Sequence, residues 1–131
     1  MLVDASVAAK LLVHEPDSDR AADLVEGQTL VAPDLIFAEL ANILWKYHRR
    51  GIIAAPDIGR FGIADLFDRI VPGLDLHEAA LNLAVTLNHP AYDCFYLALA
   101  IAENDVLFTA DRRFHAACAA SPHEVRVRLL G

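Results

Sequence analysis

The sequence lacks the features that would place the protein in a membrane or an oxidising compartment. No apolar run in its 131 residues reaches the roughly 18 residues that a membrane span requires. Asp4 and Lys10 interrupt the apolar stretch that a secretory signal would need. Only two cysteines are present, Cys94 and Cys118, and they form neither a CxxC motif nor a zinc spacing, so we expect both to be core residues. These absences predict a soluble, cytoplasmic protein.

Positive charge is also scarce. The chain has 11 Lys and Arg against 18 Asp and Glu, and its net charge of −7 at first argues against a nucleic-acid partner. However, the positive residues are bunched, and bound cations would offset part of the acidic excess. Charge alone therefore does not decide whether the protein binds a nucleic acid. The bunches are Lys46 with Arg49 and Arg50, Arg112 with Arg113, and Arg126 with Arg128.

What the sequence does contain is enough apolar material for a core. Hydrophobic residues make up 56% of the chain and charged residues 22%. We find no repeat, low-complexity tract or Gly/Ser linker, so we expect a single compact domain. None of the six histidines forms an HExxH or similar pair, which argues against a zinc site. We interpret His89, near Asp93, as a loop residue rather than a general base.

Apolar periodicity and turn residues predict strands that alternate with helices. This alternation indicates an α/β fold with a parallel sheet covered on both faces, in which ligands gather beyond the carboxyl ends of the strands. The predicted strands are 1–4, 29–32, 70–76, 106–109 and 124–129. The predicted helices are 6–13 beginning at Ser6, 17–26, a long helix capped by Asp34 and ended by Gly51, 56–69, 77–87, 91–104 and 111–119.

Four acidic residues stand out in this arrangement. Asp4 ends the first predicted strand and Asp111 follows the strand at 106–109, so both belong at the carboxyl edge of the sheet. Asp93 lies in the first turn of a very apolar helix, where an isolated carboxylate is costly unless it caps, pairs or binds a cation. Glu39 lies among apolar neighbours, with Asn42 three residues further on the same helix face.

Each acid also has a structural explanation. Asp4 and Asp111 are placed to cap helices, and Asp93 complements the dipole at a helix N-terminus. Glu39 as a mid-helix residue would ordinarily face solvent. Taken one at a time, Asp111 is explained well as a helix cap, whereas the structural explanation is weakest for Glu39, because its neighbours are apolar. Four acids from separate segments are harder to dismiss, because three of them lie near strand-to-helix junctions that can meet at one edge.

Clustered carboxylates favour a divalent cation. Two like charges ~4 Å apart repel by about 4 kcal/mol at an effective dielectric constant near ~20. Mg²⁺ and Mn²⁺ prefer oxygen ligands, and such ions can activate a water and stabilise the leaving oxygen of a phosphodiester. The acids therefore predict metal-dependent phosphodiester hydrolysis. In this hypothesis one or two ions deliver a water to the scissile phosphate and a 5′-phosphate product remains.

Four sequence blocks resemble a known family. They are VDASV at 3–7, AELANILW at 38–45, YDCFYLALA at 92–100 and FTADRRF at 108–114. In this order they are similar to the PIN-domain proteins, and within them to the VapC toxins of bacterial toxin–antitoxin pairs. The resemblance spans essentially the whole chain, and the YDCFYLALA block is its most specific part. One departure is Pro90, where many relatives have Ser or Thr; Pro suits the first turn of a helix.

The resemblance implies a fold, an activity and a set of roles. The fold would be a single PIN domain over 1–131, a three-layer α/β/α sandwich with a central parallel sheet of about five short strands. The activity would be that of a Mg²⁺- or Mn²⁺-dependent endoribonuclease, forming a homodimer and silenced by a cognate VapB-like antitoxin. The matching catalytic and metal-binding acids are Asp4, Glu39, Asp93 and Asp111, and the supporting residues are Ser6, Thr109 and, from its position beside Glu39, Asn42.

The bunched cations are candidates for RNA contact. Lys46, Arg49 and Arg50 lie near the end of the Glu39 helix, where they would also interact favourably with the helix C-terminus. Arg112 and Arg113 follow Asp111 directly and are placed to reach a phosphate. For the aromatic residues Trp45 and Tyr47 we expect core or dimer packing rather than base stacking.

Three other functions are alternatives to a metal-dependent ribonuclease. An aspartyl-nucleophile phosphatase would need an acid at position 6, which is Ser6, and a phospho-acceptor receiver would need a lysine late in the chain, whereas the only lysines are Lys10 and Lys46. The more serious alternative is a PIN-like scaffold that binds RNA or protein without cutting it. Four converging carboxylates argue against a binding-only role.

Overall fold

Five short parallel strands run through the middle of the computed structural model, which describes residues 1–54 and 62–131. One sheet has the order β1-β4-β5, and β2 pairs with β3 in a second sheet. The backbone amide of Val31 donates to the carbonyl of Met1 at 3.2 Å, so β2 lies beside the start of β1 and the two sheets adjoin. The strands are β1 (Leu2–Val3), β2 (Val31–Pro33), β3 (Arg69–Val71), β4 (Leu107–Thr109) and β5 (Val127–Leu129).

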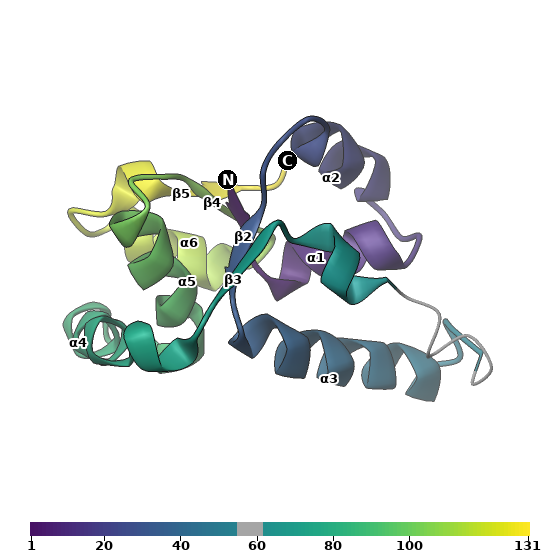
Figure 1. The fold of residues 1–131 in the computed structure, drawn as a ribbon, viewed down its shortest axis with the longest axis horizontal. Coiled ribbons are helices and arrows are strands. Elements are labelled where there is room, and N and C mark those ends of the chain that lie inside the picture. The colour runs from purple at the N-terminus through teal and green to yellow at the C-terminus, as the bar shows by residue number, and fades with distance from the viewer. Residues whose placement is uncertain (55–61) are drawn as a thin grey trace.

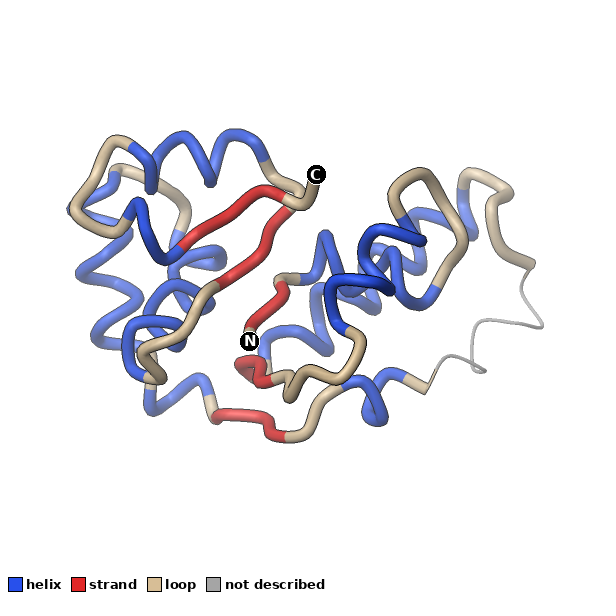
Figure 2. Tube along the Cα trace, turned by 90° about the horizontal axis from the view of Figure 1, so that it is seen from above, coloured by secondary structure: helices blue, strands red, loops and turns tan. Residues whose placement is uncertain are grey.

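Helices cover the strands on both sides. Figure 1 shows α1, α2 and α3 on one side of the strands and α4, α5 and α6 on the other, and Figure 2 shows the same chain from above. The predicted α/β architecture with parallel strands is therefore confirmed. The helices are α1 (Ala5–Leu12), α2 (Ser18–Val25), α3 (Leu35–Arg49), α4 (His77–Leu87), α5 (Ala91–Ala102) and α6 (Arg112–Ala119).

The core lies between these layers and centres on α5. Its side chains from Tyr96 to Ala100 are buried, because α5 contacts β2 and β4 as well as α4. Leu2, Val3 and Leu107 on the strands are fully buried, as expected for parallel strands covered on both faces. A helix that is apolar nearly all round is stable only in such a position. Cys94 and Cys118 are buried free thiols, as predicted.

For α1 the structure selects one of the two caps that the sequence offered, and for α3 the predicted side-chain cap is absent. Asp4, and not Ser6, occupies the N-cap of α1, where its side chain accepts from the amide of Val7. Asp34 precedes α3 but makes no side-chain cap bond with it, and instead accepts from the amide of Gly73 at 3.0 Å. Pro33, predicted to end the second strand, is its last residue; a proline is tolerated there because β2 is short and ends at this point.

The segment before α4 differs most. Of the predicted helix 56–69, residues 56–61 lie outside the described residues, and the remainder forms a short 3₁₀ turn, η2 (Ile63–Leu66), before β3 begins at Arg69. The predicted strand 70–76 ends at Val71, because Pro72 lacks the amide that a ladder needs, and η3 (Gly73–Asp75) follows. In the last predicted strand, η4 (Glu124–Arg126) replaces the first half.

Within residues 1–54 and 62–131, none of the helices combines the length and the apolar character needed to span a bilayer.

Candidate active site

The four acids singled out in the sequence line one cavity of about 180 Å³. They reach it from four separate places: the end of β1, the second turn of α3, the first turn of α5 and the residue that caps α6. A chain with parallel strands brings these places together because β1 and β4 end at the same edge of the sheet. The cavity is lined by Asp4, Ala5, Ser6, Glu39, Ile43, Asp93 and Asp111.

Asp4 is the most deeply buried of the four, with only 4% of its surface exposed. Its carboxylate accepts hydrogen bonds from the hydroxyl of Ser6 and from the backbone amide of Val7. Burial raises the pKa of Asp4 to about 6, although the hydroxyls of Ser6 and Thr109 and the Val7 amide oppose the rise. The charge of Asp93 raises it further. Asp4 therefore carries its charge near neutral pH at a cost to the fold.

Ser6 and Thr109 tie the ends of β1 and β4 together at the cavity. The Ser6 hydroxyl donates to Asp4 and accepts from the backbone amide of Ala110 at 2.9 Å, which links the two strand ends. Thr109 is fully buried, and its hydroxyl accepts from the amide of Asp111 at 3.0 Å. Both hydroxyl residues predicted to support the acids thus lie where they orient two of them.

Glu39 receives a hydrogen bond from a buried tyrosine. The hydroxyl of Tyr96, a fully buried residue of α5, donates to Oε1 of Glu39 at 2.5 Å. Burial raises the pKa of Glu39 to about 7; the hydrogen bond from Tyr96 lowers it, and the charges of Asp93 and Asp4 raise it. Burial and the Glu39 carboxylate together raise the pKa of the Tyr96 hydroxyl well above its ordinary value. Tyr96 therefore acts as a permanent donor that holds Glu39 toward α5.

Asp93 is held by His89. Nε2 of His89, four residues earlier in the chain, lies 2.6 Å from Oδ2 of Asp93. Burial raises the pKa of Asp93, the hydrogen bond and the charge of His89 lower it, and the charge of Asp111 raises it. His89 does lie in the loop before α5, as predicted, but its ring is a direct partner of the acid.

Asp111 combines the two roles that the sequence had left open. Its carboxylate caps α6 by accepting from the amides of Arg113 at 2.9 Å and Phe114 at 3.1 Å. The same side chain lines the acidic cavity. Asp4 likewise caps α1 and lines the cavity. Helix capping and membership of the acidic cluster are therefore not alternatives here.

The donor set suits a hard divalent cation, although the carboxylates do not converge on one point. All four are oxygen ligands, which Mg²⁺ and Mn²⁺ prefer. In the part of the chain that the structure describes, no three His, Cys, Asp or Glu side chains are grouped closely enough to hold an ion as they stand. Each carboxylate is turned toward a hydrogen-bond donor of the protein. In each acid these bonds are accepted by one carboxylate oxygen, so the other oxygen could bind an ion while the donor stays in place.

The other predicted site residues lie around the cavity rather than in it. Asn42 is exposed and lines an adjoining groove that shares Glu39 with the cavity. Lys46, Arg49 and Arg50 are exposed at the far end of α3, and the guanidinium of Arg49 lies 5.2 Å from the ring centre of Trp45. Arg112 and Arg113 are exposed in the first turn of α6, directly after Asp111.

Sequence reasoning missed three residues at this site: Tyr96, the role of His89, and Ile43, which lines the cavity one turn after Glu39. A signal for the first two was present. Positions 89, 93 and 96 have helical spacing, and a tyrosine within an apolar helix needs a partner for its hydroxyl. The sequence does not show that this partner is Glu39, because the contact forms only where α3 and α5 meet in the folded protein.

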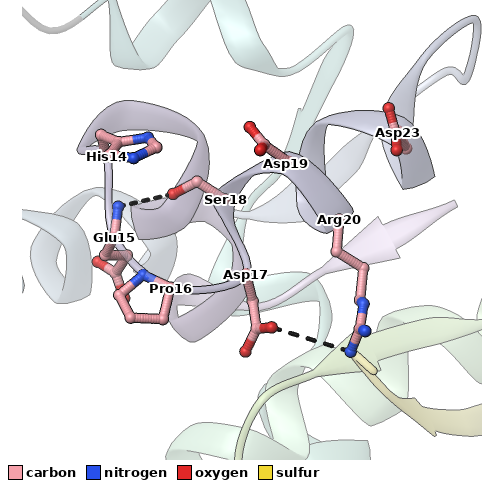
Figure 3. A pocket seen from close by; sticks show the side chains of 8 residues that line it. All are labelled: His14, Glu15, Pro16, Asp17, Ser18, Asp19, Arg20 and Asp23. Atoms are coloured by element: carbon pink, nitrogen blue, oxygen red, sulfur yellow. Dashed lines mark hydrogen bonds and ion pairs between the residues drawn. The ribbon is translucent and has the colours of Figure 1, made fainter.

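A larger hollow of about 820 Å³ lies elsewhere, where α1 connects to α2 (Figure 3). None of the four acids lines it. Its side chains are mostly exposed, and the bonds between them are local, such as that from the amide of Glu15 to the hydroxyl of Ser18 at 2.9 Å and the 3.8 Å ion pair of Arg20 with Asp17. Its size reflects an open surface and not an enclosed site.

Comparison with known proteins gives consistent matches over most of the chain. The model of the PIN domain matches residues 1–120. Ribonuclease VapC3 of Pyrobaculum aerophilum is 35% identical over 120 residues, covering 86% of this chain and 90% of that protein. Ribonuclease VapC9 of Mycobacterium tuberculosis is 31% identical over 125 residues, covering 86% and 87%. The crystal structure of PAE2754 from P. aerophilum has a TM-score of 0.62 at 28% identity, covering 88% of this chain and 77% of that chain.

The burial of Asp4 predicts that Asp4→Asn stabilises the protein in EDTA at pH 7.5. With a pKa near 6 in the fold and 3.8 ordinarily, the charge on Asp4 costs on the order of 3 kcal/mol above pH 6. The free energy of unfolding of the wild type decreases as the pH rises from about 4 to about 6, because Asp4 must ionise within the fold. At pH 4 Asp4 is protonated in the fold, so Asp4→Asn should there be no more stable than the wild type. Thermal unfolding should show a melting temperature several degrees higher at pH 7.5.

The control for this comparison is Asp23→Asn, which alters an exposed acid and should leave the melting temperature unchanged. A lower melting temperature for Asp4→Asn than for wild type in EDTA would contradict the electrostatic account.

The contact between Tyr96 and Glu39 predicts that Tyr96→Phe raises the pKa of Glu39 above its wild-type value of about 7, because a donor to the charged carboxylate is removed. The measurement is an NMR titration of ¹³C-labelled glutamate carboxyl groups in EDTA. Tyr47→Phe is a matched control, since it removes the tyrosine hydroxyl that donates to Glu15 and leaves Glu39 alone. A Glu39 pKa near 4.5 in the wild type, or one that Tyr96→Phe does not move, would show that the site is not as described.

Proposed function

Because the chain belongs to the PIN-domain family, we propose that it is a metal-dependent endoribonuclease that hydrolyses RNA phosphodiesters at the acidic cavity. The observation that carries the proposal is the meeting of Asp4, Glu39, Asp93 and Asp111 in one cavity of about 180 Å³. Proteins named as ribonucleases match this chain at 31% to 35% identity over most of its length, which supports the same activity.

The residues that would hold Mg²⁺ or Mn²⁺ are these four carboxylates. Bound there, the cation would supply Lewis-acid chemistry, namely activation of a water and neutralisation of phosphate charge. Its positive charge would also lower the raised pKa values of Asp4, Glu39 and Asp93, because an opposite charge favours the ionised carboxylate.

The surrounding residues orient the acids. Ser6 and the Val7 amide fix Asp4, Tyr96 fixes Glu39, and His89 fixes Asp93. Such partners set the direction of a metal ligand and contribute typically ~10- to 100-fold to metal affinity or activity. In this proposal they are positioning residues, and the supporting roles of Ser6 and Thr109 are of the same kind.

The exposed cations around the cavity would contact the RNA backbone. Arg112 and Arg113 are nearest in sequence to a cavity acid, since both directly follow Asp111, while Lys46, Arg49 and Arg50 extend along α3 away from Glu39. Together they would present local positive charge to a polyanionic substrate, although the chain as a whole carries a net charge of −7.

The names of the relatives extend the proposal to a biological role. We infer a toxin of a type II toxin–antitoxin pair, paired with a VapB-like antitoxin, acting as a homodimer in the cytoplasm. Its support is the naming of the two compared relatives as VapC ribonucleases. The first observation that would test it is genomic: a short reading frame for a DNA-binding antitoxin beside this one.

The direct test of the activity is cleavage of a fluorescent single-stranded RNA by purified protein. We expect cutting with Mn²⁺ or Mg²⁺, none in EDTA, and a loss of at least about 100-fold in Asp93→Asn, because the site supplies several kcal/mol of charge stabilisation. Asp23→Asn should cut like the wild type. No cutting of several RNAs, tRNA included, would favour the non-cutting scaffold, and cutting that survives EDTA would exclude the proposed mechanism.

A second prediction concerns the cations beside Asp111. The double variant Arg112→Gln/Arg113→Gln should raise KM with little change in kcat, because the two guanidinium groups bind the ground state and the transition state alike. The slope of log KM against log salt concentration should decrease by about 1 to 1.5, which is the change expected when two phosphate contacts to a single strand are lost. Arg69→Gln is the control, since Arg69 is paired with Glu103 at 2.5 Å at the start of β3. An unchanged salt dependence in the double variant would place the RNA elsewhere.

A further inference from the structure

A second hollow adjoins the acidic cavity and has a different chemistry. It is a groove of about 300 Å³ between α3 and the start of α5, lined by Leu35, Ala38, Glu39, Asn42 and Tyr92. Glu39 lines both the groove and the acidic cavity, so the two are neighbours. We propose that the groove is a nucleobase subsite, in which Tyr92 stacks on a base of the RNA next to the scissile phosphate. This inference rests on the proposed function.

The backbone of α5 places Tyr92 beside the reaction site. Tyr92 and Asp93 are consecutive residues of its first turn, and consecutive side chains of a helix diverge by about 100°. When Asp93 faces the acidic cavity, Tyr92 therefore faces the neighbouring groove. A nucleotide whose phosphate lies at Asp93 would have its base within reach of the Tyr92 ring.

The lining of the groove suits a neutral flat ring better than a phosphate. Leu35 and Ala38 are apolar, and no Lys or Arg is among the residues that line it within the part of the chain that the structure describes. Glu39 would repel a phosphate when ionised. Tyr92 is 66% exposed, so its ring is accessible to a ligand in the groove. Stacking on such rings is the general way in which proteins hold unpaired bases.

Asn42 would add selectivity among bases. It lies one turn beyond Ala38 on α3, is exposed, and lines the same groove as Tyr92. Its amide offers donors and an acceptor, the groups that recognise the edge of a base. From the sequence, Asn42 was expected to hydrogen-bond either to Glu39 or to a ligand, and its place in the groove favours the ligand.

The test is RNA binding by fluorescence anisotropy, with Ca²⁺ present to neutralise the acidic cavity. The probe is a labelled single-stranded RNA in which the bases are removed one position at a time. Removing the base that stacks on Tyr92 should weaken binding by about 5- to 150-fold. Tyr92→Ala should bind intact RNA more weakly than the wild type by the same factor. It should bind the abasic RNA with the same affinity as the wild type, because the stacking partner is already missing. Tyr92→Phe and Tyr92→Trp should keep the wild-type affinity for intact RNA. Asn42→Ala should change the base preference at that position.

The control is Leu74→Ala, which removes an 88% exposed apolar side chain outside the groove and should bind RNA like the wild type. Equal affinity of Tyr92→Ala and wild type for intact RNA would overturn the inference. So would a change in oligomeric mass by light scattering in Tyr92→Ala, because the groove would then be a protein interface. Tyr92-dependent binding without metal-dependent cleavage would support the subsite while contradicting the proposed nuclease function.

Discussion

The cost of burying several carboxylates in one cavity is the constraint around which this fold is arranged. Asp4 is almost fully buried, and burial raises the pKa of Asp4, Glu39 and Asp93. The surrounding donors partly offset this cost: a serine hydroxyl, a tyrosine hydroxyl, a histidine ring and the amides at the start of α1 and α6. A protein that needed only stability would place apolar residues here, so the cost is evidence of a selected function.

The parallel topology explains why such different segments meet. β1 and β4 pair in register and end at the same edge, which places Asp4 beside Ala110 and Asp111, with Ser6 bonded across the gap. α3 and α5 then deliver Glu39 and Asp93 from opposite sides of the sheets (Figure 1). The apolar groove along the same two helices neighbours the acidic cavity at Glu39, so one end of the molecule offers a place for phosphate chemistry and a place for a base.

The sequence predicted what depends on local pattern and failed where distant packing decides. Strong periodicity located α4 and α5 closely, and strand-then-acid spacing located Asp4 and Asp111. The secondary structure from Gly62 to Asp75 was predicted wrongly. Its helical pattern is weak, and the pairing of β3 with β2 determines the conformation there, which local propensity does not reveal. For the same reason Tyr96 and His89 were missed, and Asp34 was expected to cap α3 although Gly73 from a later segment takes its carboxylate.

The central claim is that the four carboxylates constitute one cation site. Anomalous X-ray diffraction from crystals soaked in MnCl₂ tests it most directly. A manganese peak is expected inside the cavity, with carboxylate oxygens of Asp4, Asp93 and Asp111 at bonding distance and Glu39 facing the ion or its waters. An empty cavity at saturating Mn²⁺ would contradict the cation site.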